Sequence, residues 1–176
     1  MHTKALLLLP LTLVAMGALA PSVEAAANPP LVAQTPIQVS AEAKRFDLVT
    51  VDAAQHRLLA AHSQAGTFTV LDLNTGKPTA EMAVGTKPSG LAVDAADGKY
   101  FTGTTEGVSV IDSKSLKKTG FIATSGPTDD MAYDADSHKL YVTHDDGTEL
   151  WVVDARKDAI IGDIDIPGVP ESMGMD

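Results

Sequence analysis

The segment Leu140–Asp154 reads LYVTHDDGTELWVVD, and its parts recur upstream at a nearly constant spacing. The closing VVD at Asp154 corresponds to VID at Asp112 and to VLD at Asp72, so these aspartates lie 42 and 40 residues apart. A period of about 41 residues with strand-like content is typical of a propeller or an array of repeats.

A second series of motifs repeats with the same period. The stretches FDLVTVD, LAVD and MAYD end at Asp52, Asp94 and Asp134, which are 42 and 40 residues apart. The last residues, Met173–Asp176 (MGMD), match this motif again, 42 residues after Asp134. We therefore expect three complete repeats, followed by the beginning of the first strand of a fourth.

Each repeat contains four short apolar runs, which in the third repeat span residues 130–133, 140–143, 150–153 and 160–166. Runs of this length that are rich in Val, Ile, Tyr and Thr and bounded by turn residues indicate strands. Several runs are apolar on both sides, as blades buried on both faces require. The predicted fold class is all-β, with β-propeller blades of four antiparallel strands in an incomplete, open array, because three blades are too few to close a ring.

The N-terminus has the pattern of a secretory signal peptide. Residues 5–19 are apolar, and a small-residue site favours cleavage after Ala25. We divide the chain into a signal peptide (1–25), a flexible leader (26–36) and a partial propeller (37–176). Residues 36–39 have the pattern of one isolated strand, and residues 37–39 of this run open the partial propeller. The expected location is the periplasm or the secreted fluid, with no membrane span after cleavage.

Composition limits the classes of function. The chain has no cysteine, so it carries no disulfide and no thiolate metal site. Its formal net charge of −10 disfavours nucleic-acid binding, which needs Lys and Arg for the phosphates. The repeated aspartates are interpreted as turn-formers, because an Asp side chain accepts hydrogen bonds from backbone amides two residues further on.

The run Leu140–Thr143 (LYVT), followed by a glycine and VVD, resembles the YVTN repeat of exported YncE-like β-propellers. The resemblance covers residues 37–176. It implies about seven blades and a ring closed by an N-terminal strand, for which residues 37–39 are the candidate. The chain departs from the pattern where His144 replaces the asparagine, and His62 stands in the same place in the first repeat.

Strand topology sorts the loops by end. In an antiparallel meander, the loops after the second and fourth strands lie at one end, here called the top. We expect the top to be acidic, with Lys87 as its one base, and to attract cations or basic ligands. The acidic residues and histidines assigned to the top are Glu106, Asp129, Asp130, Asp145, Asp146, Glu149, Glu171, His62 and His144.

The predicted metal site at the top consists of Asp129, Asp130, His144, Asp145 and Asp146. Imidazole together with carboxylates suits a divalent ion. Calcium is the alternative that the resemblance implies, since lactonase-like propellers hold it with acidic residues. The competing interpretation is a solvated Asp-Asp-Gly turn. We expect no other cofactor, and no residue has a partner that would make it catalytic.

The leading functional hypothesis is an exported binding or scaffold module for an unknown ligand or protein partner. The alternatives are a lactonase-like hydrolase, a dehydrogenase-associated propeller, or a truncated gene product without activity of its own. An open array also predicts self-association, because the blade faces at residues 46–90 and 131–170 would expose apolar surface.

Overall fold

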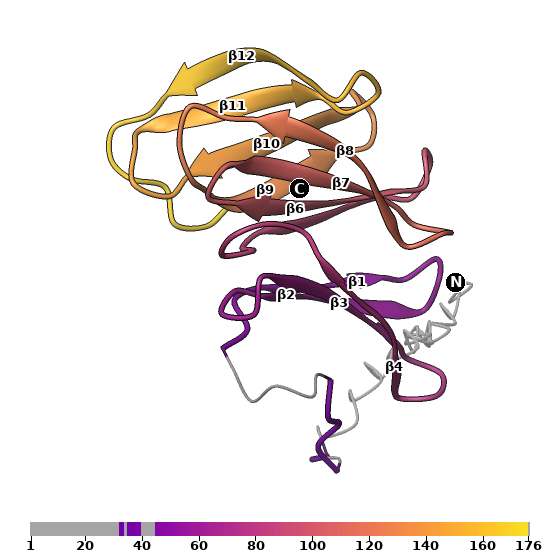
Figure 1. Ribbon diagram of the computed structural model, residues 1–176. Coiled ribbons are helices and arrows are strands. Elements are labelled where there is room, and N and C mark those ends of the chain that lie inside the picture. The colour runs from indigo at the N-terminus through magenta and orange to yellow at the C-terminus, as the bar shows by residue number, and fades with distance from the viewer. Residues whose placement is uncertain (1–31, 34, 40–44, 176) are drawn as a thin grey trace, which may run out of the picture. The chain divides into compact units, whose positions relative to one another are not determined.

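The computed structural model describes residues 32–33, 35–39 and 45–175 (Figure 1). The internal contacts divide the chain into two units, Met1–Thr35 and Pro36–Asp176. The predicted signal peptide lies outside the described residues. Within the described part of the chain, no helix has the length and apolar character needed to cross a membrane.

The second unit contains three four-stranded antiparallel sheets, one for each repeat, which we call blades 1 to 3. Blade 1 comprises β1 (Val49–Asp52), β2 (Arg57–His62), β3 (Thr67–Asp72) and β4 (Lys77–Ala83). Blade 2 comprises β5 (Leu91–Asp94), β6 (Lys99–Thr104), β7 (Gly107–Asp112) and β8 (Lys117–Ala123). Blade 3 comprises β9 (Thr128–Asp134), β10 (Lys139–His144), β11 (Glu149–Asp154) and β12 (Ala159–Asp165). The predicted all-β class and the four strands per blade are confirmed.

The repeated aspartates organise the turns, as predicted. Asp72 Oδ1 accepts hydrogen bonds from the amides of Asn74 and Thr75 at 2.9 and 2.8 Å. The other five aspartates of the two series also accept backbone amide bonds from residues two or three positions further on. Each of these turns ends on a residue with φ between 51 and 66°, such as His56 or Gly76, directly before the next strand. This left-handed residue reverses the chain within a tight turn.

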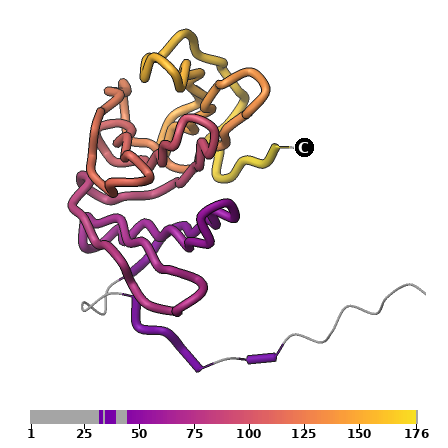
Figure 2. Tube along the Cα trace, turned by 90° about the vertical axis from the view of Figure 1, so that its right-hand side faces the viewer, coloured from indigo at the N-terminus to yellow at the C-terminus, as the bar shows by residue number. Residues whose placement is uncertain are grey.

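Neighbouring blades pack through apolar side chains. We call the face of a blade toward the preceding blade its leading face, and the face toward the following blade its trailing face. Leu59 and Phe68 on the trailing face of blade 1 are fully buried against Tyr100 and Ile111 on the leading face of blade 2. The corresponding contact between blades 2 and 3 buries Phe101, Val108, Leu140 and Trp151. The successive blades follow one another in chain order (Figures 1 and 2).

Two expected strands do not form. Residues 36–39 belong to no strand, and neither do the described residues 173–175. A strand is defined by its hydrogen bonds to a neighbour, and in the described chain every sheet consists of the four strands of one repeat. Asp176 lies outside the described residues.

Candidate functional site

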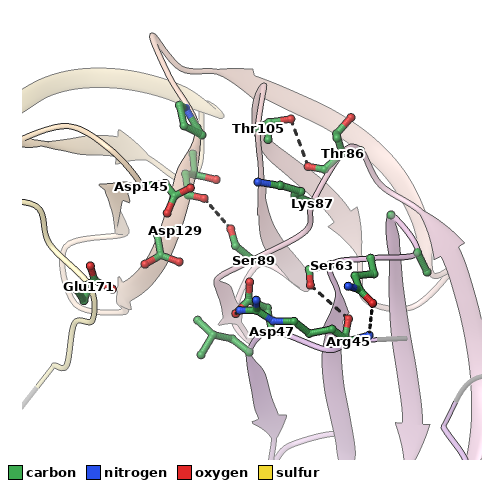
Figure 3. A pocket seen from close by; sticks show the side chains of 17 residues that line it. Arg45, Asp47, Ser63, Thr86, Lys87, Ser89, Thr105, Asp129, Asp145 and Glu171 are labelled. Atoms are coloured by element: carbon green, nitrogen blue, oxygen red, sulfur yellow. Dashed lines mark hydrogen bonds and ion pairs between the residues drawn. The ribbon is translucent and has the colours of Figure 1, made fainter. Parts of the chain in front are cut away.

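The top of the three blades contains a hollow of about 970 Å³. It is lined by the loops that follow β2, β4, β6, β8, β10 and β12, together with the segment before β1. Figure 3 shows Asp129, Asp145 and Glu171 on one side of this hollow and Arg45 and Asp47 on the other. Because all three blades contribute, the hollow depends on how the blades pack.

Among the acids that line the hollow, Asp129 has a raised pKa. Its backbone belongs to β9, and its side chain is half-buried among other acids. Burial, followed by the negative charges of Asp145, Asp47, Asp130 and Glu171, raises the pKa of the Asp129 carboxyl from 3.8 to about 6. Binding either a proton or a cation would stabilise a carboxyl group that is repelled by neighbouring negative charges.

The backbone beneath Asp129 is fixed by close contacts between blades 2 and 3. The Gly90 amide donates to the Asp129 carbonyl at 2.6 Å, and Ser89 Oγ donates to the Thr128 carbonyl at 2.8 Å. A Cβ at Gly90 would lie 2.3 Å from the Asp129 carbonyl oxygen, so only glycine permits this approach. Blade 2 therefore positions the central acid of the hollow.

Two bases lie at the hollow. Lys87 follows β4, and Arg45 precedes β1, where its guanidinium is 3.6 Å from Asp47. Ser63 Oγ and the side-chain oxygen of Gln64 bond the Arg45 backbone at 3.2 and 3.0 Å. The expectation that Lys87 is the one base at the top is wrong, because Arg45 precedes the first repeat and was not assigned to a top loop.

The five residues of the predicted metal site do not meet at one point. Asp129 and Asp145 line the hollow, whereas Asp130, His144 and Asp146 are not among its lining residues. Across the described ranges, no group of three or more His, Asp or Glu side chains is arranged to hold a metal ion. The metal site stays a prediction.

Asp130 and His144 have other contacts. Asp130 accepts the amides of Met131 and Met173 at 2.8 and 2.9 Å. The His144 ring lies 4.9 Å from the Trp151 ring, and its Nδ1 is 3.2 Å from Asp146 Oδ1. Asp130 thus links β9 to the segment after β12, and His144 packs against β11 within blade 3.

His62, the counterpart of His144 in blade 1, is fully buried. Its ring stacks on Phe46 with centroids 4.1 Å apart, and its Nδ1 lies 3.6 Å from Glu81 Oε1. The last residue of the second strand thus makes an aromatic contact in blades 1 and 3. In blade 2, Thr104 stands there and donates to the Gly107 carbonyl at 2.8 Å.

Comparison of the sequence with known families gives no match: no family model matches the chain, and neither does any curated protein. The comparisons that match are structural.

Three solved structures of propeller-like proteins are similar to this chain. Hydrazine synthase of Kuenenia stuttgartiensis is 17% identical with a TM-score of 0.63, over 67% of this chain and 36% of that one. The dihydro-heme d1 dehydrogenase NirN in complex with DHE is 23% identical with a TM-score of 0.57, over 70% and 28%. U3-55K is 12% identical with a TM-score of 0.62, over 72% and 41%.

This similarity identifies the fold as part of a β-propeller. At these identities it carries no information on activity. The chain spans about a third of the length of the structures that it matches.

Proposed function

We propose that this chain is part of an exported propeller binding protein, and that the hollow at the top takes up a multivalent organic cation such as a polyamine. The observation that carries the proposal is the raised pKa of Asp129 inside a hollow lined by four carboxylates. A cation placed there would relieve repulsion that the protein otherwise bears.

The spacing of the acids favours an extended cation over a bare metal ion. The carboxylates of Asp47, Asp129, Asp145 and Glu171 are distributed around a hollow of about 970 Å³. A metal ion needs its oxygen ligands within one coordination shell, about 2.3–2.6 Å from calcium. A polyamine carries ammonium groups several bonds apart, so each can approach a different carboxylate.

The same proposal includes the family of the propeller and its location. The LYVT run at Leu140–Thr143 supports a YVTN-repeat propeller, and the apolar residues 5–19 support export to the periplasm or the medium. Calcium binding by Asp129, Asp130, His144, Asp145 and Asp146 is the competing occupant of the top.

Calorimetric titration of spermidine into the purified chain at pH 7.5 and low ionic strength tests the proposal. We expect saturable binding, weakened by salt because the interaction is ionic, and at least about tenfold weaker in the double variant Asp129→Asn/Asp145→Asn. Asp163→Asn is the matched control, since Asp163 is exposed on β12 outside the hollow.

Equal spermidine affinity in the hollow variant and the control would refute the proposed site. A parallel titration with calcium chloride separates the two occupants. Saturable calcium binding that is lost in Asp145→Asn/Asp146→Asn, without spermidine binding, would replace the polyamine with the metal.

A further inference from the structure

The loop between β10 and β11, residues 145–148, contains an aspartate directly followed by a glycine, Asp146 and Gly147. In such a pair the amide nitrogen of the glycine can attack the side-chain carboxyl carbon of the aspartate and close a five-membered succinimide ring. Glycine favours this closure because it has no Cβ to restrict the backbone. The side chain of Asp146 is 74% exposed, so water can reach the ring that would form.

The imidazole of His144 lies beside both groups that would react. Its Nδ1 atom is 3.2 Å from Oδ1 of Asp146. A Cβ built on Gly147 would lie 2.4 Å from the same Nδ1, so the Gly147 backbone runs directly against the ring. Within the described part of the chain, this Nδ1 is buried and makes no hydrogen bond. A group able to transfer a proton therefore adjoins both the attacking residue and the carboxyl oxygen.

The backbone of the loop is fixed on both sides of this pair. The Asp145 amide donates to the Pro127 carbonyl at 2.9 Å, and the Thr148 carbonyl accepts the amide of Ile166 at 2.9 Å. Among the residues that the structure describes, the Gly147 amide has no hydrogen-bond acceptor. The attacking nitrogen is thus held near His144 without being engaged elsewhere.

The sequence has one other pair of this kind, Asp97 and Gly98, and its backbone is held more firmly. The Asp97 amide donates to Asp94 Oδ1 at 3.0 Å. The Gly98 carbonyl accepts the Ser113 amide at 2.8 Å. The Asp97 carboxylate is 3.8 Å from the Arg156 guanidinium, which favours its ionised and less reactive form.

A histidine also lies near Asp97, but its ring nitrogens have partners. Nδ1 of His138 is 3.9 Å from Asp97 Oδ2 and 3.1 Å from the Tyr133 hydroxyl. Nε2 of the same ring is 2.7 Å from Arg156 Nη2. The two aspartate–glycine pairs therefore differ in the histidine nitrogen that is available to each, which makes Asp97 an internal reference for Asp146.

We propose that Asp146 and Gly147 form a self-modification site, at which His144 promotes the conversion of aspartate to isoaspartate. The Gly147 nitrogen bonds to Cγ of the protonated Asp146 carboxyl, and Oδ1 departs as water. That water carries the carboxyl proton and the amide proton, which Nδ1 of His144 accepts and passes on. Water then opens the ring at its main-chain carbonyl, so that the chain continues through Cγ. The water lost in closure is regained, and no oxidant or reductant is needed.

The conversion would alter the hollow at the top of the blades. It adds one methylene to the main chain next to Asp145, which lines the hollow, and it leaves a free carboxylate on the altered residue. The charge of the loop is therefore kept while the position of one acid shifts. The geometry of the hollow would change with the age of the protein.

Peptide mapping of the purified chain after prolonged incubation at 37 °C and pH 7.4 with EDTA tests the proposal. Electron-transfer dissociation distinguishes isoaspartate from aspartate by its backbone fragments. We expect isoaspartate to accumulate at Asp146 at least about tenfold faster than at Asp97. His144→Gln should slow the reaction at Asp146 at least about tenfold and leave that at Asp97 unchanged.

His138→Gln is the matched control, because it changes the imidazole near the other pair and should not alter the rate at Asp146. A variant that merely loosened the loop would react faster, so slowing in His144→Gln separates proton transfer from a loss of structure. An equal or faster rate at Asp146 in His144→Gln would overturn the proposal, as would isoaspartate at Asp146 no greater than at Asp97. No polyamine is present, so the result is independent of the spermidine titration.

Discussion

The Tyr100 hydroxyl of blade 2 donates a 2.7 Å hydrogen bond to Oδ2 of Asp52, which is 1% exposed at the end of β1. Gln55 and Arg57 donate to the same hydroxyl oxygen at 3.2 Å. Burial, together with the hydrogen bond to Asp52, raises the pKa of Tyr100 to about 12. One phenol thus joins a turn of blade 1 to the second strand of blade 2.

Tyr100→Phe should destabilise the protein by about 1.5–3 kcal/mol, because a buried carboxylate loses a charge-assisted hydrogen bond. Urea unfolding at pH 7 measures the loss. Tyr141→Phe is the control, since Tyr141 lies on the outer face of blade 3 and should change stability by less than about 0.5 kcal/mol. Equal effects of the two substitutions would show that the Asp52 contact contributes no stability.

Asp129→Asn should raise the melting temperature at pH 7.5 in the absence of ligand. The pKa of Asp129 is about 6 in the folded protein and 3.8 ordinarily, so this group favours folding below pH 3.8 and loses that contribution as pH rises through 6. The difference between variant and parent should therefore shrink from pH 7.5 toward pH 4. Thermal melts across this range measure it, and a variant that is less stable at pH 7.5 would contradict the explanation.

Gly90→Ala should destabilise the protein by about 1–3 kcal/mol, because the new Cβ would lie 2.3 Å from the Asp129 carbonyl oxygen and the two blades would have to separate. Gly162→Ala provides the control. A Cβ at Gly162 meets nothing within 4 Å, so its effect should stay within about 0.5 kcal/mol. Chemical denaturation compares the two, and a harmless Gly90→Ala would refute the tight approach.

Asp72→Ala should lower the melting temperature at neutral pH. Hydrogen bonds from the Thr75 amide and hydroxyl and the Asn74 amide lower the pKa of Asp72 below 3.8. The stabilisation is therefore present above pH 3.8 and is lost as pH falls through the lower value in the folded protein. The difference in melting temperature between the variant and the parent protein should be smaller at pH 3 than at pH 7. An unchanged melting temperature at pH 7 would show that the Asp72 side chain does not stabilise the turn.

The periodicity of the sequence predicts the strands and turns because both depend on local chemistry. The runs predicted at 140–143 and 150–153 lie inside β10 and β11, and the terminal aspartates cap the turns after the strands. Loop topology likewise places Asp129, Asp145 and Glu171 together at the top, since it depends only on strand order.

Contacts between blades could not be predicted from the repeat pattern, because they depend on the direction in which a side chain points toward the neighbouring blade. The tyrosine near the terminal aspartate stands on the second strand in blade 2, as Tyr100, and on the first strand in blade 3, as Tyr133. Tyr100 pairs with Val93 across the strands, and Tyr133 pairs with Leu140, so either position of the pair supplies the ring. The two tyrosines therefore do not fall at the same position when the repeats are aligned. The residues assigned to the metal site are divided in the structure, since Asp129 and Asp145 line the hollow and His144 does not, and the site stays a prediction.

The pKa of Asp129, measured by carbon-detected NMR titration of its carboxyl with and without spermidine, tests the proposed site most directly. The account predicts a value of about 6 in the free protein and a lower value with spermidine, because a nearby cation favours the ionised form. A value near 3.8 that spermidine does not change would contradict it.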